Sequence, residues 1–112
     1  MSEEHGGQEE VSEQEVLHAL IRLLQALNDN QAHGREDATV VIGTAEQQAA
    51  GMVRGSQLYE KVLQRAQEER FLVYDAEAAT ARALSSSTGD LEPYKFTPEA
   101  LEMLRWADAL GE

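Results

Sequence analysis

Apolar residues first recur at helical spacing after residue 12, and this run continues to residue 27. Ser12 and Glu15 stand before it at the spacing of a capping box, in which each side chain accepts a hydrogen bond from a free backbone N–H. Within the run, four leucines follow the 3-4-3 spacing of paired helices, namely Leu17, Leu20, Leu24 and Leu27. The pattern predicts an N-terminal helix that is either the central core helix or also part of a homodimer interface.

The middle of the chain switches between strand and helix signals. Residues 38–42 are short and rich in β-branched side chains, which predicts a strand. Thr44 and Gln47 form a second capping-box pattern ahead of a short helix. Ser56 is a suitable cap for a longer helix over residues 57–69, whose apolar face consists of Leu58, Tyr59, Val62, Leu63 and Ala66.

Two further strand patterns enclose a polar interval. Residues 71–74 and 94–96 are rich in aromatic and aliphatic side chains, and each predicts a short strand. In the interval, Asp75 stands before the strong helix formers of residues 76–84, so a capped helix is expected there. The Ser- and Gly-containing residues 85–90 predict a flexible loop.

The last helix is predicted from its start signal and its apolar stripe. Thr97 suits an N-cap, and Pro98 suits the first helical turn because its missing N–H would lack a partner there. The stripe then consists of Leu101, Leu104, Ala107 and Leu110. Trp106 lies on the same helix, and we expect it in the core or, with the leucines of the first helix, in a dimer interface.

Length and composition limit the possible classes of protein. A chain of 112 residues is expected to form one domain, here residues 12–112 behind a disordered acidic N-terminus of residues 1–11. The absence of cysteine excludes disulfides, thiolate catalysis and Cys-ligated zinc. The polar start predicts no signal peptide, and no apolar stretch approaches membrane-spanning length. We therefore expect a cytoplasmic protein without a membrane partner.

The formal net charge is −12, and its distribution is uneven. The N-terminal third is the most acidic, whereas residues 38–75 are nearly balanced. Because Lys and Arg dominate phosphate binding, a strongly acidic protein begins at a disadvantage as a DNA binder. The acidity either keeps the protein soluble or selects a basic protein partner.

Catalytic and ligand-binding signatures are sparse. The three histidines, at positions 5, 18 and 33, do not have metal-ligand spacing. There is no nucleophile elbow, phosphate-binding loop or dinucleotide fingerprint. The sequence therefore predicts a protein that is not an enzyme and uses no metal or other cofactor.

Residues 61–72 and 94–101 resemble two pieces of winged helix-turn-helix regulators of the MarR-like and PadR-like kinds. The first is similar to a recognition helix that leads into a wing strand, and the second to the returning wing strand and a Thr-led helix. The residues that carry the resemblance are Leu63, Phe71, Leu72, Tyr74, Tyr94, Phe96, Thr97, Leu101 and Leu104. The chain departs from the family at Arg70, where glycine is usual. The resemblance implies a mainly α winged helix-turn-helix domain with a small β wing and an additional N-terminal helix.

The same resemblance implies a transcription regulator that binds double-stranded DNA as a homodimer. Arg, Lys and Gln are suited to contacts with phosphates and base edges. The candidate DNA-binding residues are Arg54, Gln57, Lys61, Gln64, Arg65 and Lys95. The alternative is a winged-helix protein-interaction or assembly module that does not bind DNA. A DNA binder should gather these cations on one face, whereas an interaction module should show them scattered or neutralised beside exposed apolar side chains.

Overall fold

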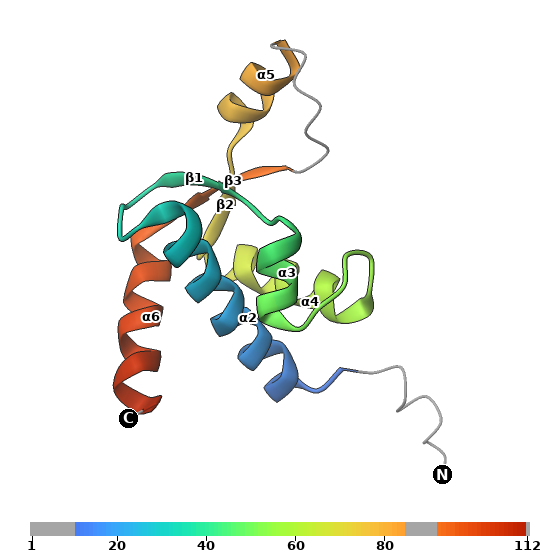
Figure 1. Cartoon of the computed structure of the whole chain (residues 1–112), viewed down its shortest axis with the longest axis vertical. Coiled ribbons are helices and arrows are strands. Elements are labelled where there is room, and N and C mark those ends of the chain that lie inside the picture. Colours follow the sequence, from blue (N-terminus) through green and yellow to red (C-terminus); the bar gives the residue numbers. More distant parts are fainter. Residues whose placement is uncertain (1–10, 85–91, 112) are drawn as a thin grey trace.

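The computed structural model describes residues 11–84 and 92–111 (Figure 1). Helices make up most of this part of the chain, and three short strands form one antiparallel sheet, as expected from the sequence. In chain order the elements are α2 (Glu13–Leu27), η1 (Asn28–Ala32), β1 (Ala38–Val41), α3 (Thr44–Ala50), α4 (Gln57–Glu68), β2 (Leu72–Tyr74), α5 (Ala76–Leu84), β3 (Pro93–Phe96) and α6 (Pro98–Gly111). Among these elements, no helix has the length and apolar character needed to cross a bilayer.

Helix α2 is the centre of the core. The predicted capping box is present, because the Ser12 hydroxyl accepts from the Glu15 N–H and the Glu15 carboxylate accepts from the Ser12 N–H. Leu20, Leu24 and Leu27 are each 1% exposed or less in the single chain. These three candidate interface residues are therefore core residues in the single chain, where α3, α4 and α6 pack on α2.

The sheet has the order β1-β3-β2, so the last strand in the chain lies in the middle. Tyr94 pairs with Val40 on one side and with Tyr74 on the other. Phe96 and Tyr94 are buried on the core side, and Lys95 between them points to the opposite face. The three strands begin or end within one residue of their predicted limits.

The start of α3 differs from the prediction by one residue. The N-cap is Gly43, not Thr44, and the carboxylate of Glu46, not the side chain of Gln47, accepts the hydrogen bond from the cap N–H. The amide of Gln47 instead donates to the Ile42 carbonyl. The predicted Thr44–Gln47 capping box is therefore wrong, because the helix begins one position earlier and buries Glu46.

At its C-terminus, α4 ends in a Schellman motif. The N–H of Phe71 donates to the Ala66 carbonyl at 2.8 Å, and the N–H of Arg70 donates to the Gln67 carbonyl at 3.1 Å. This geometry places Arg70 in the left-handed region, at φ 64°. Arg70 therefore adopts the backbone conformation that glycine adopts without strain.

Replacing Arg70 by glycine is expected to stabilise the domain by about 1 kcal/mol, because the left-handed conformation costs a residue with a Cβ about 1–2 kcal/mol. Thermal unfolding should show a rise in Tm of about 4–8 °C. Arg70→Ala is the control, since it removes the charge and keeps the Cβ. An equal gain in the alanine variant would show that charge, not backbone strain, is responsible.

After β2, helix α5 forms a projection at the top of Figure 1. The predicted cap is present, since one carboxylate oxygen of Asp75 accepts from the Ala78 N–H at 3.0 Å and the other from the Thr39 hydroxyl at 2.8 Å. These bonds lower the pKa of the Asp75 carboxyl, the Ala78 N–H being the largest cause. The predicted loop at residues 85–90 lies outside the described residues.

The start of α6 and the first described residue are held by contacts with the rest of the structure. Thr97 caps α6 as predicted, because its hydroxyl accepts from the Ala100 N–H at 3.2 Å. The same hydroxyl donates to the Arg70 carbonyl at 2.6 Å, which joins the start of α6 to the end of α4. Residues 1–10 of the predicted disordered terminus lie outside the described residues, whereas Val11 packs against the core.

Candidate functional site

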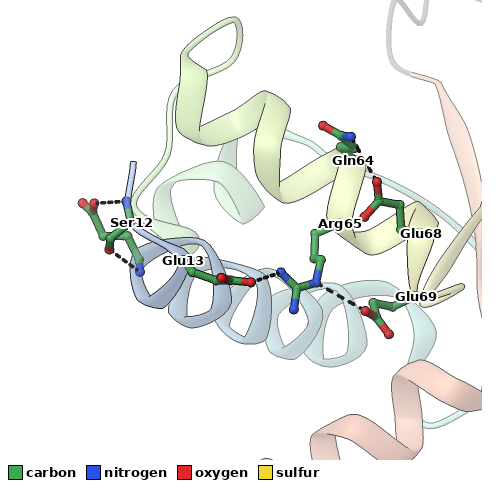
Figure 2. A network of polar contacts seen from close by, with 7 residues as sticks. Ser12, Glu13, Gln64, Arg65, Glu68 and Glu69 are labelled. Carbon is green, nitrogen blue, oxygen red and sulfur yellow. Dashed lines mark hydrogen bonds and ion pairs between the residues drawn. The ribbon is translucent and has the colours of Figure 1, made fainter. Parts of the chain in front are cut away.

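Arg65 stands at the middle of the candidate DNA face, and two carboxylates hold it. Its Nη1 lies 3.0 Å from Oε2 of Glu13 in α2, and its Nε lies 3.4 Å from Oε2 of Glu69 (Figure 2). The hydrogen bond to Glu13 is the main cause that raises the pKa of the Arg65 guanidinium. The guanidinium therefore points across to α2 and is already paired with negative charge.

The other side chains on the outer side of α4 give no positive surface. Gln64 donates to the Glu68 carboxylate at 3.0 Å, one turn away on the same helix (Figure 2). Lys61 is exposed and lines a groove of about 310 Å³ between α2 and α4, but Glu68 lines the same groove. Glu60 is also exposed beside Lys61. Carboxylates therefore match or outnumber cations along this helix.

The remaining candidate DNA contacts do not extend this face into a basic surface. Lys95 lies on the sheet face opposite to the core, whereas α4 packs on the core side. Arg54 lines a cavity of about 180 Å³ together with Tyr59, Glu92 and Tyr94. Lys95 therefore does not share a face with the candidates on α4, of which Gln57 and Lys61 are exposed.

An apolar groove of about 250 Å³ runs between α2 and α6. Leu17 and Trp106, two of the candidate interface residues, line it together with Leu20, Phe71 and Met103. Trp106 is 52% exposed, and Leu110 one turn further along is 65% exposed. Helix α6 thus carries apolar surface that the described part of the chain leaves uncovered.

Charged side chains lie at the edge of this groove and beside Trp106 on α6. Glu69 and Arg65 line its edge, and they are paired with each other. On α6, Glu99 and Glu102 are exposed and lie on the side of Trp106 by helical spacing. The groove therefore has an apolar floor with Trp106 in its lining. The Glu99 and Glu102 carboxylates stand on the same side of α6 as Trp106, and neither is in an ion pair within the described residues.

Glu46 is a second feature, and the sequence pattern did not single it out. It is only 5% exposed, and it accepts from the side-chain amides of Asn30 and Gln31 at 3.0 Å each and from the Gly43 N–H at 3.0 Å. Burial raises its pKa, but these hydrogen bonds outweigh burial, so the pKa lies below its usual range. The neutral donors satisfy the carboxylate, which indicates a structural role.

Comparisons of the chain with family models, with curated proteins and with solved structures find no match. Within residues 11–84 and 92–111, no cluster of three His, Asp or Glu side chains could hold a metal ion. The chemistry of the α4 surface and of the α2–α6 groove must therefore decide between the two candidate functions.

Proposed function

We propose that this chain is a winged-helix protein-interaction module that binds a basic, amphipathic segment of a partner protein in the α2–α6 groove. The winged-helix assignment is supported by the order of the elements, in which a strand, two helices and a strand precede the projection with α5, and a strand and a helix follow it. This order is that of the family the sequence resembles. The observation that carries the function is Trp106, which is half exposed in an apolar groove and has the exposed carboxylates of Glu99 and Glu102 on its side of α6.

Two physical arguments favour a protein partner over DNA. Large aromatic side chains that are exposed beside an apolar groove are typical anchors of protein contacts. The central cation of α4 is occupied by Glu13 and Glu69, and phosphates would have to displace both carboxylates. Opposite charge speeds association and selects partners, so the carboxylates of α6 favour a basic segment.

The groove can be tested with a synthetic amphipathic helix that has leucine on one face and lysine on the other. Trp106 is the only tryptophan in the chain, so its fluorescence reports directly on binding. We expect saturable binding with a blue shift of the emission, and no binding of the same peptide with glutamate in place of lysine. Glu99→Gln/Glu102→Gln should weaken binding about fivefold, since each exposed ion pair contributes at most about 1 kcal/mol.

Asp29→Asn/Glu36→Gln is the matched control, because it removes the same charge from exposed residues that do not line the groove. This control should bind as tightly as the unaltered protein. Equal weakening in both double variants would mean that the peptide senses only net charge. That result, or an unchanged Trp106 spectrum at saturation, would contradict the proposal.

DNA binding stays the second candidate because of one observation. Gln57 and Lys61 lie four residues apart on α4 and are both exposed, which suits contacts in a major groove. If this face binds DNA, the ion pairs of Arg65 must open on binding. That requirement is what makes DNA the weaker proposal.

A further inference from the structure

The two edge strands of the sheet differ in whether their outward backbone groups have hydrogen-bond partners. Because β3 lies in the middle, β1 and β2 each have one free edge. On β1, the amide of Gln31 acts in place of a neighbouring strand, since it donates to the Val41 carbonyl at 2.7 Å and accepts from the Val41 N–H at 3.0 Å. A free edge invites pairing with another chain, and this one is blocked.

The edge of β2 has no such cover. The Thr97 N–H donates to the Phe71 carbonyl at 3.2 Å, and the Asp75 N–H donates to the Pro93 carbonyl at 3.0 Å. Residues 71, 73 and 75 therefore direct their backbone groups to β3, and alternation directs those of Leu72 and Tyr74 outward. Within the described chain, no hydrogen bond reaches the outward groups of these two residues.

The outward groups of β2 match those of a second copy. If two β2 strands pair antiparallel about Val73, Leu72 of each copy lies opposite Tyr74 of the other. Each such pair exchanges two N–H···O bonds, so all the outward groups of both strands are satisfied. The Val73 side chains, 41% exposed in the single chain, then meet at the two-fold axis.

Charge at the ends of the strand supports the same pairing. The strand itself is uncharged, whereas Arg70 precedes it and Glu77 follows it in the first turn of α5. Both side chains are exposed. Antiparallel pairing about Val73 brings the Arg70 end of one strand toward the Glu77 end of the other, whereas parallel pairing would bring like charges together.

We propose that two copies of this chain associate through β2 to form a continuous six-stranded antiparallel sheet. The contact is short, so the dissociation constant is expected on the order of 100 µM. The interface differs from the one that the sequence predicts through the leucines of the first helix, because Leu20, Leu24 and Leu27 are buried in the core. It uses different residues from the proposed groove, of whose lining only Phe71 adjoins β2.

Val73→Glu tests this proposal by analytical ultracentrifugation over a range of protein concentrations. The unaltered protein should pass from 12.4 kDa to about twice that mass. In the variant two carboxylates would face each other across the axis, and dimerisation should weaken at least tenfold. The variant keeps its fold, since residue 73 is exposed and its neighbour on β3 is Lys95.

Two companion samples separate pairing at β2 from a general effect of charge. Val53→Glu places the same carboxylate at a valine that is 70% exposed outside the sheet, and it should dimerise like the unaltered protein. A mixture of Val73→Glu and Val73→Lys should regain the dimer, because glutamate then faces lysine. A monomeric unaltered protein at millimolar concentration, or a dimer that Val73→Glu leaves intact, would overturn the proposal.

Discussion

Replacing Glu46 by glutamine is expected to lower the free energy of unfolding by about 3 kcal/mol at pH 7. The carboxylate accepts from Asn30 and Gln31 with one oxygen and from the Gly43 N–H with the other. An amide must present its NH₂ group to one of these donors, so at least one hydrogen bond to a charged acceptor is lost and a buried donor is left unsatisfied. Chemical denaturation of both proteins measures the difference.

The pH dependence of this difference follows from the direction of the pKa shift. The pKa of Glu46 in the folded protein lies below its reference value of 4.5. The carboxylate therefore contributes its full stability above pH 4.5, and the contribution is lost as the pH falls through the lower, folded pKa. We expect the two proteins to converge in stability at acidic pH.

Glu60→Gln is the matched control for Glu46→Gln, because Glu60 is an exposed glutamate on α4. Its effect on stability should stay within about 0.5 kcal/mol at every pH. If Glu46→Gln costs less than about 1 kcal/mol at neutral pH, or if its cost does not fall at acidic pH, the hydrogen-bonded carboxylate does not hold η1 against the start of α3.

Removing the carboxylates around α4 is expected to create DNA affinity that the unaltered protein lacks. In the variant Glu13→Gln/Glu60→Gln/Glu68→Gln/Glu69→Gln, Arg65 loses both of its partners and Lys61 loses its acidic neighbours. We expect this variant to bind mixed-sequence duplex DNA measurably at low salt, at concentrations at least about tenfold below those at which the unaltered protein shows no binding, and its affinity should weaken steeply with added salt. Fluorescence anisotropy of a labelled duplex measures both effects.

A variant of equal net charge controls for the general change in electrostatics. Asp29→Asn/Glu36→Gln/Glu77→Gln/Glu99→Gln also removes four exposed carboxylates, none of them on α4 or at the N-terminus of α2. This variant should gain little DNA affinity. If the two variants gain equally, the carboxylates around Arg65 have no special role in suppressing DNA binding.

Local signals predicted most of the secondary structure. Ser12, Ser56 and Thr97 each accept a hydrogen bond from a backbone N–H three residues later, as their sequence contexts indicate. Asp75 caps α5 in the same way. Caps and helical periodicity act over a few residues, so a single sequence contains the necessary information. The exception is Thr44, where a glycine one position earlier took the role of cap.

The contacts around Arg65, Glu46 and the leucines of α2 could not be predicted, because they join residues far apart in the chain. Glu13 and Arg65 meet across α2 and α4, and nothing in either local pattern pairs them. Glu46 is buried by amides from η1, a π-helical turn that no pattern predicted. The leucine spacing of α2 fits both a core helix and a dimer interface. Only the packing of α3 and α4 on α2 shows that three of these leucines belong to the core.

Binding of the unaltered protein to mixed-sequence duplex DNA at low salt tests the central claim most directly, with Lys61→Ala/Arg65→Ala as its companion. Because Glu13 and Glu69 neutralise Arg65, we expect no measurable affinity for either protein. Salt-sensitive binding by the unaltered protein that the double variant loses would contradict this expectation, and would establish α4 as a DNA-contacting helix.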